Sequence, residues 1–251
     1  MAQFPKFWWR ERPLIFGHRG ACHAAPQNTL AAFRRAAEMG ADGVELDVHL
    51  TVEGIPVVIH DERVDATTDG SGRVAELTLP QIKELDAGAR FDVAFAGERV
   101  PTLEEVLAEV GQRLIINIEL KPSTRGSGGL EEAVVAVVRR MGMLERVWFS
   151  SFKPYALYWI RQQEPSVPCG LLYSPLTFGS RLLAPVTPHE ALHPHHSLVR
   201  ESLVRRAHRR GLRVVTWTVD DEDKAKRFAE WGVDVIITNE PERLLALWSE
   251  K

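Results

Sequence analysis

The stretch "GVELDVHLTVEGIPVVIHDE", residues 43–62, combines strand-forming segments with polar groups that apolar strands normally lack. It contains two short runs rich in Val and Ile, 43–50 and 55–61, a composition typical of β-strands. Glu45 and Asp47 lie two positions apart in the first run, and His60 and Asp61 end the second. Carboxylates are rarely buried without a partner. These four side chains are therefore the first candidates for a functional site.

Short Val, Ile and Leu segments alternate with helical segments along most of the chain. Nearly all-apolar strands alternating with helices indicate a parallel sheet covered on both faces. No glycine-rich phosphate loop follows the first strand, so an α/β fold of the (β/α)8 TIM-barrel type is favoured over a doubly wound sheet. The segment 13–20 is predicted to be a strand that runs into a polar turn. Further strands are predicted at 113–121, 146–152, 167–174, 191–199, 212–219 and 234–239, and helices at 28–40, 101–111, 129–142, 154–163, 200–211, 221–232 and 241–250.

This count gives nine strands, one more than the barrel needs. Only about four residues join 44–50 to 55–61, too few for a crossover between parallel strands. Either the barrel is irregular at this point or the two segments form a hairpin. The weak segment 191–196 is a second candidate for the surplus strand. Residues 62–100 break the rhythm, and we predict that they form a small inserted cap subdomain within a single barrel domain spanning 1–251.

Composition narrows the class of protein. The 251 residues are 45% hydrophobic and 26% charged, which fits one globular domain. The net charge of -3 and the absence of a basic block argue against a nucleic-acid partner. Two cysteines, Cys22 and Cys169, give neither a disulfide framework nor a cysteine zinc site. No run approaches the length of about 18 apolar residues of a membrane span. We expect a cytoplasmic protein without stable membrane insertion, monomeric or homodimeric.

Polar residues follow the predicted strands at their carboxyl ends, where barrel enzymes build their active sites. His18 and Arg19 follow the first strand, Glu119 and Lys121 end the strand at 113–121, and Trp217 lies late in 212–219. Each residue alone has an ordinary structural explanation, such as a surface ion pair or a hydrogen-bonded histidine. The coincidence of several such groups at strand ends favours a site.

The alternation of side chains along a strand places Glu45 and Asp47 on one face. If their strand neighbours the one that ends at Lys121, Glu119 enters the same pocket. Three clustered carboxylates repel one another unless a cation lies between them. Hard oxygen ligands suit Mg²⁺, Ca²⁺ or Mn²⁺. The sequence therefore predicts one divalent cation held by Glu45, Asp47 and Glu119.

These motifs, in this order, resemble the landmarks of the glycerophosphodiester phosphodiesterase family. The resemblance covers nearly the whole chain and includes the segment "TTDGSGRVAELTLPQIKELDAG" within the insertion. It implies a TIM barrel, a divalent cation, and hydrolysis of glycerophosphodiesters to sn-glycerol 3-phosphate and an alcohol. The further motifs are "GHRGACHAAPQNTLAAF" (17–33), "INIELK" (116–121), "VPTLEEVL" (100–107), "VVTWTV" (214–219) and "GVDVIITNEP" (232–241).

The resemblance assigns roles by position. His18 and His60 become the acid/base pair, with His18 favoured as the base and His60 as the acid. Glu45, Asp47 and Glu119 become the metal ligands, and Arg19 and Lys121 contact phosphate. Trp217 is a candidate wall of the substrate pocket. Attack by water and attack by the substrate's own glycerol hydroxyl, through a cyclic intermediate, both remain open.

Three positions depart from the family pattern. Gln27 stands where Glu is usual, Ala66 where Arg is usual, and Asn239 where Asp is usual.

An alternative function is that of a related phospholipase D-like or cyclising enzyme on choline or ethanolamine lipids. That enzyme would need an apolar mouth, for which 174–186 is the candidate. We expect the insertion to cover the site and to select compact head groups. The alternative to this cap is that the insertion lies far from the pocket.

Overall fold

Eight parallel strands close into a barrel in the computed structural model, which describes residues 2–122, 129–177, 179 and 182–249. Closure is complete because β1 pairs with β9 on one side and with β2 on the other. The predicted TIM barrel is confirmed. The strands are β1 (Leu14–His18), β2 (Gly43–Leu50), β4 (Ile115–Leu120), β5 (Val147–Ser151), β6 (Cys169–Tyr173), β7 (Ala191–Pro194), β8 (Arg213–Thr216) and β9 (Val235–Thr238).

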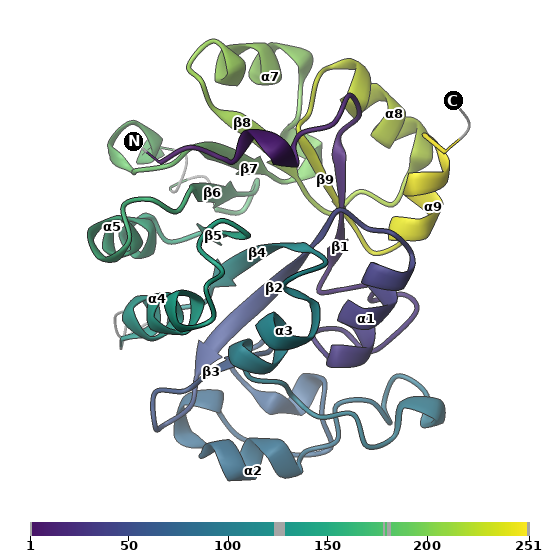
Figure 1. Cartoon of the computed structure of the whole chain (residues 1–251), viewed down its shortest axis with the longest axis vertical. Helices are drawn as coiled ribbons and strands as arrows, with labels where there is room; N and C mark the ends of the chain where they lie inside the picture. The colour runs from purple at the N-terminus through teal and green to yellow at the C-terminus, as the bar shows by residue number, and fades with distance from the viewer. Residues whose placement is uncertain (1, 123–128, 178, 180–181, 250–251) are drawn as a thin grey trace.

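Helices surround this barrel on its outside (Figure 1). Local sequence fixes where they begin: Thr29 and Thr102 accept hydrogen bonds from backbone N–H groups of the first turns of α1 and α3. The outer helices are α1 (Leu30–Glu38), α3 (Leu103–Val110), α4 (Leu130–Arg140), α5 (Pro154–Gln163), α7 (Glu201–His208), α8 (Glu222–Glu230) and α9 (Pro241–Ala246). The predicted last helix ends earlier than expected, and Glu250 lies outside the described residues.

The surplus strand is β3 (Pro56–Val58), which pairs with β2 in an antiparallel hairpin. Of the two readings of 43–62, the hairpin is therefore correct. The suggestion that 191–196 is surplus is wrong, because β7 pairs with both β6 and β8 inside the barrel. Its short length, its three histidines and Pro194 weaken the strand pattern there. The hairpin turns the chain back, so that residues after β3 return to the rim.

The inserted segment forms a small subdomain beside β3 and α3, at the lower end of Figure 1. It contains α2 (Leu79–Glu84) and short 3₁₀ helices at Val64–Ala66, Val74–Glu76 and Val93–Phe95. Its backbone is tied to the hairpin, since Val52 N–H donates to the carbonyl of Leu77 at 3.0 Å. Its apolar core is shared with the hairpin, because Val64, Val74, Ile82, Ala87 and Val100 of the insertion cluster with Val57 and Ile59.

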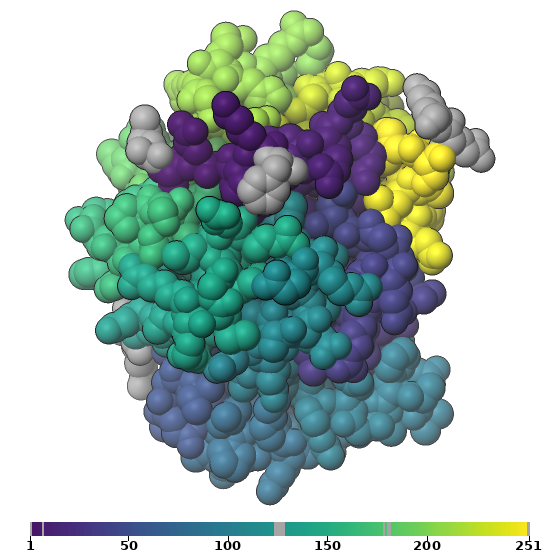
Figure 2. All heavy atoms as spheres, in the orientation of Figure 1, coloured from purple at the N-terminus to yellow at the C-terminus, as the bar shows by residue number. Residues whose placement is uncertain are grey.

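The N-terminal segment fills the end of the barrel where the strands begin, opposite their carboxyl ends. A 3₁₀ helix, Lys6–Trp8, inserts the buried indole of Trp8 against that of Trp148, with ring centroids 5.5 Å apart. Figure 2 shows this segment, in purple, lying across that face of the molecule. None of the helices in the described part of the chain is both long and apolar enough to cross a membrane.

Candidate active site

Three buried carboxylates meet at the carboxyl ends of β2 and β4. The parallel register sets Asp47 opposite Glu119, and Glu45 opposite Asn117. Because alternate residues share a face, Glu45, Asp47 and Glu119 all point into the barrel. One oxygen of each lies within 4.8 Å of the others, and their exposed fractions are 4%, 1% and 7%. Among the described residues this is the one cluster of potential metal ligands.

The electrostatics of these carboxylates fit a cation. Burial, and then repulsion from Asp47 and Glu119, raises the pKa of Glu45 well above its ordinary value. Burial also raises the pKa of Glu119. Asn117 adds a buried side-chain oxygen with no hydrogen-bond partner. The donor set consists of oxygen atoms alone, the type that hard divalent cations prefer. The acidic cluster could therefore hold a metal ion.

Two basic side chains border the carboxylates. Arg19 Nε lies 3.4 Å from one oxygen of Asp47, and Lys121 Nζ lies 3.1 Å from the other. Although burial opposes it, Lys121 and Arg19 hold the pKa of Asp47 below its ordinary value. Lys121 also pairs with Glu119 at 2.5 Å. Arg19 Nη1 donates to Gln27 at 2.5 Å, so Gln27 can orient the guanidinium through a neutral oxygen. Arg19 and Lys121 are positioned to meet an anionic ligand at the cluster.

His18 ends β1 and contacts the end of β9. Its Nδ1 lies 2.7 Å from Oδ1 of Asn239, whose amide nitrogen donates to Asp220 at 2.7 Å. The amide oxygen therefore faces the histidine, and Nδ1 must carry the proton. Burial, and then the charge of Arg19, lowers the pKa of His18 to about 4. The neutral ring leaves the lone pair of Nε2 free to accept a proton.

His60 reaches the same rim on the returning arm of the hairpin. The N–H of Ile59 donates to the carbonyl of Asp47 at 3.0 Å, which holds the two segments together. His60 Nδ1 donates to the carboxylate of Asp61 at 2.9 Å. Burial lowers the pKa of His60, while the charge of Asp47 and the hydrogen bond to Asp61 oppose that shift. The partner of His60 is an anion, whereas the partner of His18 is a neutral amide.

Sequence reasoning missed two supports of this site. His49 is buried on β2, and its Nε2–H donates to the backbone carbonyl of His60 at 3.0 Å. Asn28 donates from Nδ2 to Asp47 at 2.9 Å, while Thr29 caps α1. The sequence does indicate where His49 lies. It follows Asp47 by two positions, so the alternation of side chains along β2 places it on the same face as Glu45 and Asp47.

Two cavities that share lining residues lie at the cluster. The inner cavity, of about 60 Å³, is lined by His18, Trp217 and Leu172 among others. The outer cavity, of about 290 Å³, is lined by His49, Asp61, Glu62 and Lys153 among others. Of the inserted segment, Glu62 alone lines either cavity. Four residues border both, namely His60, Glu119, Lys121 and Phe152.

Trp217 forms one wall of the inner cavity. Its Nε1–H donates to the carbonyl of His193 at 3.0 Å, and its ring meets that of Phe152 edge-on, with centroids 5.5 Å apart. The other histidines near it belong to no described metal cluster. His193 is fully buried, and His195 stacks on His196 at 4.2 Å. The inner cavity thus brings His18 and His60 together with Glu45 and Glu119.

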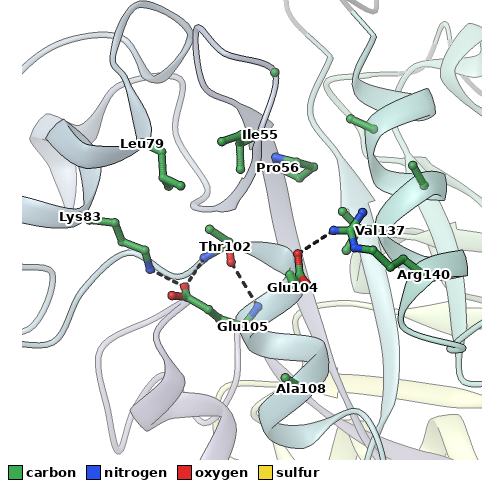
Figure 3. Close-up of a pocket in the computed structure, with 13 residues that line it drawn as sticks. Ile55, Pro56, Leu79, Lys83, Thr102, Glu104, Glu105, Ala108, Val137 and Arg140 are labelled. Carbon is green, nitrogen blue, oxygen red and sulfur yellow. Dashed lines mark hydrogen bonds and ion pairs between the residues drawn. The ribbon is translucent and has the colours of Figure 1, made fainter.

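A separate groove of about 770 Å³ lies between the hairpin, α2, α3 and α4 (Figure 3). Its charged side chains are already paired: Lys83 with Glu105, and Arg140 with Glu104 at 2.6 Å. No histidine lines it, and the acidic cluster lies outside it. We therefore assign the chemistry to the smaller cavities at the rim.

Comparison with known proteins agrees with this geometry. Residues 18–243 match the model of the Glycerophosphoryl diester phosphodiesterase family. A Glycerophosphodiester phosphodiesterase from Caldanaerobacter subterraneus is 42% identical over 94% of this chain and 98% of its own length. A phosphodiesterase from Oleispira antarctica, solved in complex with the product sn-glycerol-3-phosphate, is 31% identical, with a TM-score of 0.87 over 95% of this chain and 98% of that one. A glycerophosphodiester phosphodiesterase from Agrobacterium tumefaciens is 30% identical, with a TM-score of 0.81 over 93% and 99%.

Proposed function

The chain belongs to the glycerophosphoryl diester phosphodiesterase family, and we propose that it hydrolyses glycerophosphodiesters to sn-glycerol 3-phosphate and an alcohol. One observation carries the proposal: two histidines, whose Nε2 atoms make no hydrogen bond to a described residue, border a buried acidic cluster beside Arg19 and Lys121. The Oleispira antarctica relative, solved with sn-glycerol-3-phosphate, supports the same reaction.

The proposed cofactor is one divalent cation, Mg²⁺ or Ca²⁺, with Mn²⁺ as a third candidate. Glu45, Asp47 and Glu119 would hold it, which would relieve the repulsion that raises the pKa of Glu45. When bound, such an ion neutralises phosphate charge and makes a water molecule more acidic. The fit rests on the all-oxygen donor set and on the buried, unpartnered oxygen of Asn117.

Arg19 and Lys121 are proposed to hold the phosphate. Both side chains are 19% exposed, so each can turn from Asp47 toward a ligand in the cavity. A guanidinium can bind two phosphate oxygens at once, and an ammonium binds as a point charge. Together they would offset the negative charge of the diester and orient its phosphorus between the histidines.

Proton transfer is divided between the histidines. His18 is proposed as the base, because its lowered pKa keeps Nε2 unprotonated and ready to take the proton of the attacking hydroxyl. His60 is proposed as the acid, because the Asp61 carboxylate stabilises an imidazolium that can protonate the departing alkoxide. The attacking hydroxyl belongs either to water or to the substrate's glycerol.

The two cavities suggest how a diester would lie. The phosphate would sit at the four shared residues. The constant glycerol half would occupy the small inner cavity against Trp217, and the variable head group would occupy the larger outer one. His60 borders the outer cavity and His18 does not, which supports His60 as the group that protonates the leaving alcohol.

Further expectations remain proposals. We propose one barrel domain with residues 62–100 as its insertion, in a monomer or homodimer. The two unpaired cysteines support a cytoplasmic location.

The insertion contributes only Glu62 to the cavities, which favours a supporting position over that of a cap. The alternative on choline or ethanolamine lipids lacks support, since none of the described residues of 174–186 lines either cavity. Residues 178, 180 and 181 of that segment lie outside the described part of the chain.

A direct assay tests the proposal. Purified protein is incubated with a panel of glycerophosphodiesters, and sn-glycerol 3-phosphate is detected by an enzyme specific for it. A phospholipase D-like enzyme would instead release head group from intact lipids, and a cyclising enzyme would accumulate a cyclic phosphate. Release of sn-glycerol 3-phosphate from the panel is the expected result.

A further inference from the structure

His49 has one ring nitrogen committed to the protein and one free. Nε2 lies 3.0 Å from the carbonyl oxygen of His60. A carbonyl can only accept, so Nε2 carries a hydrogen. Nδ1 makes no hydrogen bond to any residue that the structure describes, and the ring lines the outer cavity. A neutral imidazole with its hydrogen on Nε2 presents the lone pair of Nδ1 as an acceptor.

Other polar side chains of the outer cavity can also accept hydrogen bonds from a head group or donate them to it. Asp61 engages His60 through Oδ1 and keeps a second carboxylate oxygen. Glu62 is paired with Arg73 through one oxygen, at 2.9 Å. Lys153 is exposed at the cavity and has no ion pair within the described ranges, whereas Lys121 is held by Asp47 and Glu119. The cavity thus offers several acceptors and one free cationic donor.

This combination discriminates between head groups by chemistry. A hydroxyl group can donate to His49 or Asp61 and accept from Lys153. A trimethylammonium group has no hydrogen to donate, so it would leave the lone pair of His49 without a partner. Its attraction to the carboxylates of Asp61 and Glu62 is opposed by repulsion from Lys153 and does not replace that hydrogen bond. Leaving a buried polar group unpaired is costly, so sites built for a hydroxyl reject analogues that lack one.

We propose that His49 is a specificity residue that favours glycerophosphodiesters with hydroxyl-bearing head groups, such as glycerol, over those with choline. The proposal rests on the proposed function and on the head group occupying the outer cavity. His49 also positions the backbone of His60, so its loss should slow all substrates. The ratio between two substrates separates the two roles, because the positioning effect is common to both.

The experiment compares kcat/KM for glycerophosphoglycerol and glycerophosphocholine. The variants are His49→Phe, which keeps the ring volume, His49→Leu, and His49→Gln, which keeps a donor and an acceptor. His189→Leu is the matched control, since His189 also contacts a backbone carbonyl, that of Thr187 at 2.7 Å, and lines neither catalytic cavity. Thermal unfolding verifies that each variant is folded.

The wild type is expected to prefer glycerophosphoglycerol by about tenfold, the size of one hydrogen bond. His49→Phe and His49→Leu should bring the ratio close to one, while His49→Gln and His189→Leu should keep most of it. Equal rates in the wild type, or an unchanged ratio in both apolar variants, would overturn the inference while leaving the proposed function standing. Failure of the wild type to release sn-glycerol 3-phosphate from either diester would overturn both.

Discussion

Asn239 presents its amide oxygen to Nδ1 of His18 at 2.7 Å and donates its amide nitrogen to Asp220 at 2.7 Å. The thiol of Cys22 donates to the same amide oxygen at 2.9 Å, and burial raises the pKa of that thiol to about 12. The amide can therefore adopt only one orientation. A neutral partner stabilises an imidazolium less than a carboxylate does, which agrees with the lowered pKa of His18.

The first prediction concerns the acidic limb of the pH profile. His18 acts as a base only when neutral, and its pKa is lowered to about 4. Activity should therefore persist below the ordinary histidine pKa and be lost as the pH falls through about 4. The measurement is kcat/KM against pH at saturating cation, so that loss of the metal at low pH is minimised. An acidic limb near pH 6.5 would contradict the assignment.

The second prediction concerns the basic limb. Asp61 favours the protonated form of His60, so Asp61→Asn should lower the pKa of His60 further. An acid must be protonated to act, and the basic limb of kcat/KM should move to lower pH. Asp65→Asn is the control, because Asp65 is similarly exposed and pairs with Arg63 within the insertion. An equal shift in both variants, or none in Asp61→Asn, would count against His60 as the acid.

The third prediction separates the acid from the base by the leaving group. His18→Ala and His60→Ala should each lose about 10²–10⁴ in kcat on glycerophosphodiesters, with KM changed far less. A nitrophenolate leaving group needs little protonation, so a nitrophenyl diester should rescue the variant that lacks the acid. Rescue of His60→Ala alone is expected. Rescue of His18→Ala alone would reverse the roles.

The fourth prediction concerns stability and the cation. A ligand that binds only the folded state raises the unfolding temperature. Mn²⁺, Mg²⁺ or Ca²⁺ should therefore stabilise the wild type, and Glu45→Gln or Asp47→Asn should reduce that gain. Glu164→Gln is the control, because Glu164 is also buried and charged but pairs with Arg139 at 2.8 Å, apart from the cluster. Its absolute unfolding temperature should fall while its response to the cation persists. If the cation raises the unfolding temperature of both Glu45→Gln and Asp47→Asn as much as that of the wild type, the ion binds elsewhere.

The sequence predicted the barrel and the acidic cluster because both follow from periodicity. Alternation of strands and helices indicated the fold, and parity placed Glu45 beside Asp47. Register could not be read from the sequence: that Asp47 faces Glu119 depends on which strands are neighbours. The sequence does not decide whether 43–62 forms a hairpin, because a link of four residues fits either an irregular barrel or an antiparallel turn.

The supporting contacts were harder to foresee. His49 reaches His60 only because β3 runs back along β2, so the contact is a consequence of the hairpin. Gln27 and Asn239 depart from the family pattern, yet each keeps a hydrogen bond through a neutral oxygen, Gln27 with Arg19 and Asn239 with His18. The position of the insertion depends on the apolar core that it shares with Val57 and Ile59 of the hairpin, and a single sequence does not specify that packing.

One titration tests whether this chain hydrolyses glycerophosphodiesters with a cation held by Glu45, Asp47 and Glu119. Exhaustively chelated protein is mixed with glycerophosphoglycerol, and release of sn-glycerol 3-phosphate is followed while Mg²⁺, Ca²⁺ or Mn²⁺ is added back, with Asp47→Asn run in parallel. We expect no release without a cation, recovery with at least one of the three, and little recovery in Asp47→Asn. Full activity in the chelated wild type, or equal recovery in Asp47→Asn, would contradict it.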